Sequence, residues 1–462
     1  MAEKSAIPVE LGTEKIGTLL KQYALPAIIA QTASSLYNMV DSIFIGQGVG
    51  PLAISGLAVT FPLMNLSTAF GTLVGAGAAT MLSVLLGQKN YKAANKVLGN
   101  VVSLNVILGF LFMAVALIFI DPILYFFGAS ENTLPYAKEY IQIILYGNIV
   151  THLYFGLNAA MRSSGHPKKA MALTIFTVVF NTILDPIFIF VFDMGIAGAA
   201  WATVIAQTVA MILVMRHFSD RSRAFHFEKG IFKLDPRVAK DSLTIGMGPF
   251  LMNTAACLVT LFINQQLRDY SGDLGIGSYG ICNRFIFMFI MICMGLNQGM
   301  QPIAGYNYGA KQYSRVKEVF WMTAKFGTIV TTICFCIGMF IPRLAAGIFT
   351  HDEALLNMSA EGMRILTIGF PIVGFQMIGT NFFQCLGMVK KSIILSLSRQ
   401  LLFLLPLLYS LPLWMGANGV WMSFPISDVL SALLTAILLR RLFKKFNMLK
   451  DGEESSVLGS NL

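Results

Sequence analysis

Charged side chains are scarce in this 462-residue chain, where Asp, Glu, Lys and Arg together make up only 12% of the residues. An ordinary soluble domain carries about 25% of them. Hydrophobic residues instead make up 56%, and the mean hydropathy is +0.69. A soluble protein of this length would divide into domains and cover each with charge. The composition therefore excludes the soluble globular classes.

Cysteine is also rare, and chemical signatures are missing. The six cysteines form no CxxC pair and no Cys/His cluster, so we interpret them as packing residues that hold neither disulfides nor a metal. There is no Walker A sequence and no kinase or hydrolase nucleophile signature. We therefore expect no ATP-driven motor, no enzyme and no organic cofactor.

Long apolar stretches are present instead. Each has about 20 residues or more, enough to cross roughly 30 Å of hydrocarbon at about 1.5 Å per residue. They predict twelve transmembrane helices, at 17–45, 54–82, 97–120, 136–161, 170–192, 197–215, 242–267, 276–304, 318–341, 357–386, 391–413 and 419–439.

Basic residues predict the orientation. With the N-terminus inside, the inner segments hold 26 of the 33 Lys and Arg residues, whereas the outer loops hold Arg268 and Arg343. This asymmetry follows the positive-inside rule and places both termini in the cytoplasm. The net charge of +10 then reflects topology and contact with anionic lipid, so we expect the bilayer as a partner and no nucleic acid. All four tryptophans fall near predicted span ends, which is typical of an aromatic belt.

The two halves repeat. Gly87-Gln-Lys-Asn-Tyr91 recurs as Gly309-Ala-Lys-Gln-Tyr313, and Gly165 recurs as Gly387 at the identical offset. Six spans per repeat, an even number, make the halves parallel, an arrangement common in transporters. We predict an all-α membrane protein with two pseudo-symmetric six-helix lobes at 1–220 and 241–446. A basic cytoplasmic linker at 221–240, amphipathic on the inner surface, joins them, and a cytoplasmic tail follows at 447–462.

Ionisable residues inside spans are costly and usually functional. Asp41, Asp185 and Thr203 lie about 8, 12 and 10 Å from the outer ends of their spans, at about 1.5 Å per residue. Asn181 lies one turn before Asp185, on the same helix face. Two carboxylates, an amide and a hydroxyl at one level offer oxygen ligands for a small cation such as Na+, or an acid pair that shares a proton. Mere hydrogen bonding between helices would explain neutral residues such as Ser34, but explains the two acids poorly.

The second half carries intramembrane charges of its own. Arg284 and Asp428 lie about 12 and 14 Å inside the outer ends of their spans. The similar depth predicts an ion pair that is structural or gates the transport path. His152, alone in its span, is interpreted as a packing residue, and Gly77 is interpreted as a site of close helix packing.

The polar segments resemble those of the MATE (multidrug and toxic compound extrusion) family of cation-coupled efflux transporters. The resemblance covers nearly the whole chain. It is closer to DinF-like and MepA-like members than to NorM-type members, because NorM-type members carry acids in the seventh and tenth helices, whereas residues 242–267 and 362–386 here have none. The matching segments are Tyr37-Asn-Met-Val-Asp41, Asn181-Thr-Ile-Leu-Asp185-Pro-Ile-Phe, Gly198-Ala-Ala-Trp-Ala-Thr203, Gln301-Pro-Ile-Ala-Gly-Tyr-Asn-Tyr-Gly309 and Arg162-Ser-Ser-Gly-His-Pro-Lys168.

The resemblance implies a cation-coupled antiporter that exports amphipathic, cationic drugs or metabolites by alternating access, driven by inward Na+ or H+ flow. It implies ion-coupling roles for Asp41, Asn181, Asp185 and Thr203, and a bend of the first helix at Pro26. We expect a monomer of the bacterial inner or plasma membrane. Candidate substrate contacts in its cavity are Gln31, Ser34, Tyr37, Asn38, Gln207 and Met211.

Two other functions remain open at this point. A lipid-linked oligosaccharide flippase of a related fold would need several cationic residues in its cavity, whereas the strongest intramembrane cluster here is acidic. A membrane-embedded transferase would need an acid or histidine near a membrane face, and Asp41 and Asp185 lie too deep for that role.

Overall fold

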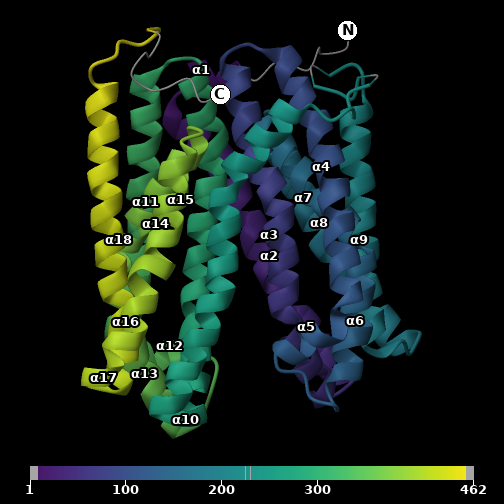
Figure 1. Ribbon diagram of the computed structural model, residues 1–462, viewed down its shortest axis with the longest axis vertical. Coiled ribbons are helices and arrows are strands. Elements are labelled where there is room, and N and C mark those ends of the chain that lie inside the picture. Colours follow the sequence, from purple (N-terminus) through teal and green to yellow (C-terminus); the bar gives the residue numbers. More distant parts are fainter. Residues whose placement is uncertain (1–8, 224, 229, 454–462) are drawn as a thin grey trace. The chain divides into compact units, whose positions relative to one another are not determined.

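The computed structural model describes residues 9–223, 225–228 and 230–453, without the side chains of residues 37–39, 51 and 273. Within these residues every regular element is a helix (Figure 1), which confirms the predicted all-α class. In this part of the chain, nine helices are long and apolar enough to cross a membrane. A further pair of helices, bent by 55° at a short break, is long and apolar enough only when the two are taken together. The chain is therefore an integral membrane protein.

The first half of the chain ends with α9, and the second half begins with α10. The elements of the first half are α1 (Glu10–Thr13), α2 (Ile16–Gly48), α3 (Pro51–Gly87), α4 (Tyr91–Ile118), α5 (Ile120–Phe126), α6 (Leu134–Tyr146), α7 (Asn148–Ser163), α8 (Pro167–Pro186), the π-helix η1 (Ile187–Val191) and α9 (Gly195–Ser219). Those of the second half are α10 (Pro236–Gly309), α11 (Tyr313–Phe340), α12 (Pro342–Gly347), α13 (Glu353–Thr367), α14 (Phe370–Cys385), α15 (Val389–Leu397), the π-helix η2 (Ser398–Leu404), α16 (Leu405–Ser410), α17 (Pro412–Met415) and α18 (Ala417–Phe446).

Each of the twelve predicted spans falls on one helix or on consecutive helices. The first lies within α2, and the fourth is divided between α6 and α7. α10 holds two spans, Pro236–Gly272 and Leu274–Gly309, because its backbone leaves the helical conformation at Gly272 with a φ of 63°. Gly50, the counterpart of Gly272 in the first repeat, has a φ of 113° between α2 and α3. Only glycine adopts such angles without strain, so both corners depend on it.

The repeat of the sequence is also a repeat of structure. α4 and α11 begin and end at equivalent positions of the repeat, and so do α7 and α14. The positive φ angles recur as well, since those of the equivalent residues Lys89 and Lys311 are 59° and 57°. Equal helix bounds and equal corners show that both halves fold by the same plan.

The helices assemble into two compact units that do not coincide with the two halves. One unit contains residues 9–13 and 29–250, and the other contains residues 14–28 and 251–453. The first turns of α2 and of α10 therefore belong to the unit that the other half mainly builds. The predicted lobes, 1–220 and 241–446, differ from these units in two segments. Residues 14–28 belong to the second unit, and residues 241–250 belong to the first.

Small residues receive the exchanged segments. A Cβ atom on Gly77 of α3 would lie 1.8 Å from the carbonyl oxygen of Ser242 in the first unit. In the second unit, a Cβ on Gly299, the repeat counterpart of Gly77, would lie 2.4 Å from the Cα of Ala24. The hydrophobic effect does not drive helices together inside a membrane, because lipid tails are as apolar as the side chains. Helices there associate instead through close backbone contacts at small residues such as these. The interpretation of Gly77 as a packing residue is confirmed.

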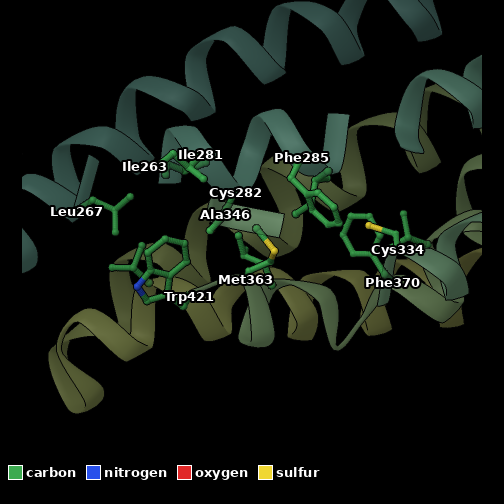
Figure 2. Packing of buried hydrophobic residues seen from close by; sticks show 14 of the residues in the cluster. Ile263, Leu267, Ile281, Cys282, Phe285, Cys334, Ala346, Met363, Phe370 and Trp421 are labelled. Atoms are coloured by element: carbon green, nitrogen blue, oxygen red, sulfur yellow. The ribbon is translucent and has the colours of Figure 1, made fainter. Parts of the chain in front are cut away.

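An apolar cluster forms part of the core of the second unit (Figure 2). α10 contributes Ile281, Cys282 and Phe285, and they face Met363 of α13 and Trp421 of α18. Trp421 is only 4% exposed, so its assignment to an aromatic belt was wrong. The other three tryptophans are exposed, as a belt requires: Trp201, Trp321 and Trp414.

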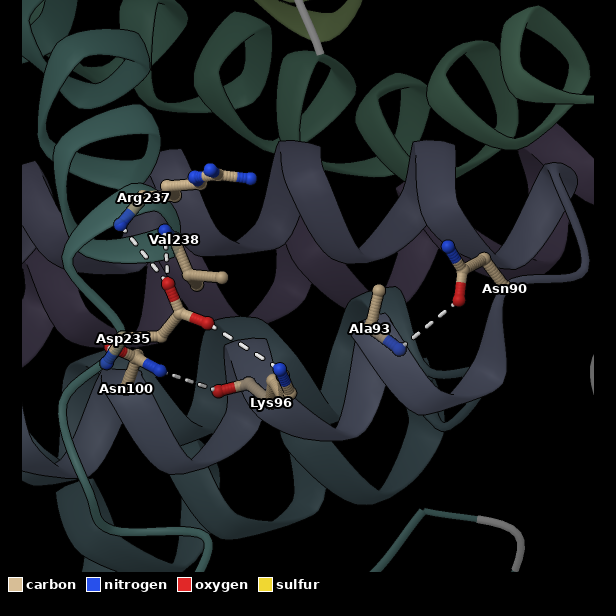
Figure 3. A network of polar contacts seen from close by, with 7 residues as sticks. All are labelled: Asn90, Ala93, Lys96, Asn100, Asp235, Arg237 and Val238. Atoms are coloured by element: carbon tan, nitrogen blue, oxygen red, sulfur yellow. Dashed lines mark hydrogen bonds and ion pairs between the residues drawn. The ribbon is translucent and has the colours of Figure 1, made fainter.

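The segment between α9 and α10 is irregular and docks on α4 (Figure 3), and its expected amphipathic placement along the inner membrane surface stays a prediction. The backbone N–H of Asp235 donates to Asn100 Oδ1 at 3.0 Å, and the Asp235 carboxylate lies 3.5 Å from Lys96 Nζ. Ser103 Oγ donates to the Phe232 carbonyl oxygen at 2.6 Å. These contacts hold the segment against the first unit.

The chain after α18 docks in the corresponding place of the second unit. Asp451 accepts hydrogen bonds from the backbone N–H of Ser314, at 3.0 Å, and from its hydroxyl. The backbone N–H of Gly452 donates to the Lys311 carbonyl oxygen at 2.9 Å. Each half thus ends with a segment that folds back on the helix that carries its third predicted span.

Candidate functional site

The acid on α8 is positioned by its own helix. Asp185 is fully buried, and its Oδ1 accepts a hydrogen bond of 2.8 Å from Asn181 Nδ2, one turn earlier. Pro186 follows at once and has no N–H to donate, and the helix then widens into η1. Such π-helical turns commonly mark functional sites. The local sequence therefore fixes Asp185 at the last regular turn of α8.

Two neighbouring helices bring further groups to this acid. Asp41 of α2 is 5% exposed and close enough to Asp185 for the two charges to repel. The Thr203 hydroxyl of α9 lies 3.4 Å from Asn181 Oδ1 and 3.1 Å from the Ala199 carbonyl oxygen. Asp41, Asn181, Asp185 and Thr203, the four residues predicted from the sequence, therefore meet in the first unit.

Both carboxylates have an unsatisfied oxygen. Within the described part of the chain, no protein group donates to the buried Oδ1 of Asp41 or to the buried Oδ2 of Asp185. A buried carboxylate oxygen without a donor is costly, and more so beside a second carboxylate. A shared proton or a bound monovalent cation would relieve both costs. The donor set fits Na+, because Asn181 and Thr203 add neutral oxygens.

No denser metal site accompanies this cluster. Among the described residues, no group of three or more His, Cys, Asp or Glu side chains is arranged to hold a metal ion. A cation at this site would depend on two carboxylates and neutral oxygens. Such a set suits a weakly held ion better than a structural metal.

Tyr140 of α6 belongs to the same cluster, and the sequence analysis missed it. Its side chain is 1% exposed, hydrogen-bonds to Thr203, and lies within electrostatic range of Asp41 and Asp185. The depth argument would have found it, since Tyr140 lies about 6 Å from the outer end of the span 136–161, at about 1.5 Å per residue. Its phenol offers a proton or an oxygen to whatever neutralises the two acids.

An apolar cluster covers the site on the side of the adjacent helix ends. Ile45, Ile189 and Ala199 each lie four residues from a site residue, toward the end of their helix. Ile45 and Ala199 are fully buried, and Ile189 is 2% exposed. Apolar side chains therefore pack beside the acids toward these helix ends.

The other predicted residues of the first half are placed as follows. Pro26 is buried, and α2 continues as a helix past it, so a bend there stays a prediction. Gln207 Oε1 accepts a hydrogen bond from the Thr151 hydroxyl. The side chains of Tyr37 and Asn38 lie outside the described residues. Three further candidates are half-buried, and their role in a substrate cavity stays a prediction: Gln31, Ser34 and Met211.

The charged pair of the second half has a different partner from the one predicted. Asp428 Oδ1 lies 2.6 Å from Arg399 Nε, whereas Arg284 makes no ion pair among the described residues. Arg284 lies on the face of α10 away from the core, since its neighbours Cys282 and Phe285 point inward. Depth alone did not reveal the direction in which each side chain points. The predicted pair Arg284–Asp428 is therefore replaced by Arg399–Asp428.

His152 behaves as the packing residue that we expected. It is fully buried, and its Nε2 lies 2.9 Å from the Ser67 carbonyl oxygen, which can only accept. The proton therefore sits on Nε2, and the contact joins α7 to α3.

The model of the MatE family matches the chain twice, over residues 26–187 and 246–410. The two matches fall on the two repeats. Among curated proteins, the chain is 27% identical over 419 residues to "Multidrug export protein MepA" of Staphylococcus aureus (strain MRSA252), a match that covers 91% of this chain and 92% of the relative. It is 26% identical to the MepA protein of Staphylococcus haemolyticus (strain JCSC1435), over 90% of this chain and 91% of the relative.

Solved structures show the same relationship. The MATE multidrug transporter DinF-BH, solved in complex with rhodamine 6G, is 36% identical and superposes with a TM-score of 0.88, over 95% of this chain and 98% of that one. A second structure, an outward-facing multidrug resistance MATE family transporter of the MOP superfamily, is 22% identical. It has a TM-score of 0.90 over 97% of this chain and 100% of that one. At that identity the second match supports the fold alone.

Proposed function

This chain belongs to the MatE family, and from that membership we propose that it exports amphipathic cations, driven by the inward flow of Na+ or H+. The names of the relatives support export of drugs, since the MepA proteins are called multidrug export proteins. The rhodamine 6G bound by DinF-BH makes that compound the first candidate substrate. The basic residues of one membrane side support a bacterial plasma-membrane protein with both termini in the cytoplasm.

One observation carries the coupling proposal: Asp41 and Asp185 are buried together, and each has a carboxylate oxygen without a donor among the described residues. Two adjacent carboxylates in a low dielectric cannot both stay ionised and empty at low cost. The pair must therefore exchange a proton or a cation with solvent whenever the site opens. Export is coupled to this ion if the conformation that releases the proton or cation from the acid pair is also the conformation that binds the substrate.

The neutral members of the site distinguish the two candidate ions. Asn181, Thr203 and Tyr140 supply oxygens that a sodium ion would bind, whereas a proton needs only the carboxylates. Thr203→Val should therefore impair export more under a sodium gradient than under a proton gradient if Na+ is the coupling ion. Export that a proton gradient drives, that a sodium gradient does not drive and that Thr203→Val leaves unimpaired would favour H+.

The test uses the full chain in proteoliposomes, with Na+ and H+ gradients imposed separately and rhodamine 6G measured in the lumen. Asp41→Asn and Asp185→Asn remove charge while they keep shape, and each should abolish gradient-driven transport with normal insertion. The matched control is Asp121→Asn, which removes a half-buried acid 2.9 Å from Lys138 on the same unit. Wild-type transport by the double variant Asp41→Asn/Asp185→Asn would refute the coupling site.

A further inference from the structure

A basic pocket lies at the end of α9, away from the acid pair. It has a volume of ≈ 550 Å³ and lies where α9 meets the irregular segment that follows it. The residues that line it are Leu213, Arg216, His217, Ser219, Asp220 and Arg223. α9 is one of the candidate membrane spans, so its end falls at the depth of lipid headgroups.

Further groups approach this pocket from the start of α8. The ring of His166, between α7 and α8, meets the ring of His217 at a centroid distance of 4.8 Å. Burial, together with the positive charges of Lys169 and Arg223, lowers the pKa of His166 to about 4. His166 is therefore neutral at physiological pH, and it can donate one N–H without adding charge.

The acid among the described lining residues is already engaged. Asp220 accepts hydrogen bonds from the backbone N–H and the hydroxyl of Ser222, at 3.1 and 2.7 Å, and lies 3.2 Å from Arg223 Nε. Arg216 is exposed and forms no ion pair in the described part of the chain. One carboxylate is thus opposed by three cations, Arg216, Arg223 and Lys169, so the net charge around the pocket is positive.

Two arginines and the neutral His166 together suit a phosphate group. Guanidinium groups bind phosphate oxygens with two parallel hydrogen bonds, and the histidine N–H group can add one more. The remaining lining is apolar: Leu213 is 38% exposed, and Ile212 beside it is 54% exposed. Leu213 lies one turn before Arg216 on the same helix face, toward the membrane interior. A ligand here would meet charge at one end and hydrocarbon at the other.

We infer that this pocket binds an anionic phospholipid, with its phosphate between Arg216 and Arg223 and an acyl chain along Leu213. Basic pockets at the ends of membrane helices hold anionic headgroups in this way. A soluble phosphate would use the same arginines but would gain nothing from the apolar side. The inference does not depend on the coupling site or on the exported substrate.

The experiment is native mass spectrometry of the purified full chain, with phosphatidylglycerol or phosphatidylcholine added in equal amounts. The double variant Arg216→Gln/Arg223→Gln should retain phosphatidylglycerol more weakly, by about fivefold for each arginine removed. Lys233→Gln/Lys240→Gln is the matched control, since it removes two exposed charges outside the lining, one from the segment that follows α9 and one from the first turns of α10. Its phosphatidylglycerol retention should equal that of the wild type, and phosphatidylcholine should not distinguish the three proteins.

Three outcomes would overturn the assignment. Equal phosphatidylglycerol retention by both double variants would show that the pocket does not hold the lipid. Displacement of phosphatidylglycerol by an equal concentration of inorganic phosphate would assign the site to soluble phosphate. If the double variant misfolds, the single variant Arg216→Gln decides, because Arg216 is exposed and has no ion pair to lose among the described residues. Unchanged lipid retention in that variant would also reject the site.

Discussion

Arg399 Nε lies 2.6 Å from Asp428 Oδ1, inside the second unit and beside a broken span. Asp428 is only 2% exposed, and a Cβ atom on Gly369 would lie 3.1 Å from its Oδ2. Gly369 separates α13 from α14, which are bent by 55° relative to each other. Arg399 itself belongs to the π-helix η2. The ion pair therefore joins the π-helix η2 to α18, at the point where α18 lies against the break between α13 and α14.

Breaking this pair should destabilise the protein. Asp428→Asn leaves the Arg399 guanidinium without its partner, and loss of one partner of a buried pair costs about 3–5 kcal/mol. The cost should fall toward the lower end because the Arg399 side chain is 27% exposed. Thermal stability in detergent measures it, and the swap Arg399→Asp/Asp428→Arg should recover part of the loss. The losses of thermal stability caused by Arg284→Gln and by Asp428→Asn should add strictly in the double variant. A non-additive loss would show that Arg284 and Asp428 interact, as the sequence had suggested.

The exchanged helix segments give a packing prediction. Gly77→Ala would place a methyl group 1.8 Å from the Ser242 carbonyl oxygen, so the backbones must separate. Overpacking of this kind costs about 1–3 kcal/mol, and the melting temperature should fall. Gly280→Ala is the control, since a Cβ there meets nothing within 4 Å in the middle of a helix. Alanine gains about 1 kcal/mol over glycine in a helix, so that variant should be as stable as the wild type or more stable. Equal effects of both substitutions would show that the contact does not constrain the helices.

The hydroxyl of Tyr140 should contribute to transport, and its removal should leave the fold intact. Tyr140→Phe removes the hydroxyl that meets Thr203 near the two acids and keeps the ring in its apolar surroundings. One lost hydrogen bond is worth about 1 kcal/mol, or roughly fivefold in ion affinity. The concentration of coupling ion that gives half-maximal export should rise by that factor. Tyr136→Phe, one turn earlier on the same helix, should leave it unchanged, and a similar shift in both would remove Tyr140 from the site.

The docked tail should respond to acid. Burial raises the pKa of Asp451, but the hydrogen bonds from Ser314 outweigh it and hold that pKa below its ordinary value of 3.8. The contact is therefore complete above the ordinary value and is lost only as the pH falls through the lower pKa of the folded protein. Hydrogen exchange at the Ser314 amide should be slow at neutral pH and fast in Asp451→Ala, which removes the acceptor. Slow exchange in that variant would mean that other contacts protect the amide.

The orientation can be tested with single cysteines in a background without the native ones. Cysteines at Lys92, His166 and Lys390 should react only with thiol reagents on the cytoplasmic side, following the positive-inside rule. Cysteines at Gly50, Asn132 and Gly416 should react from outside. Labelling of position 166 from outside would reverse the topology, and with it the side on which the basic pocket lies.

The sequence predicted most of the acid site because one physical quantity, depth in the membrane, selects it. Asp41, Asp185 and Thr203 lie on three helices at one level, and the fixed rise of about 1.5 Å per residue is enough to see that. The same quantity failed for Arg284, because depth does not specify the direction of a side chain around its helix. The apolar neighbours Cys282 and Phe285 carry that information, since they recur with the helical period and face the core. Arg399 was missed as a partner for a related reason: the π-helix η2 alters the spacing that a regular helix would give.

The two units cannot be separated by cutting the chain between its halves. Residues 14–28 complete the unit built mainly by the second half, and residues 236–250 complete the unit built mainly by the first, at nearly equal positions of the repeat. Each half therefore contributes its first helical segment to the unit that the other half mainly builds, and its own unit contains the corresponding segment of the other half. Two copies of a protein encoded by a single-repeat gene would exchange this segment in both directions, so the exchange is consistent with an origin of the chain by duplication of one repeat. Fusion of two such genes would then let the copies diverge, one keeping the acid pair and the other the arginine–aspartate pair.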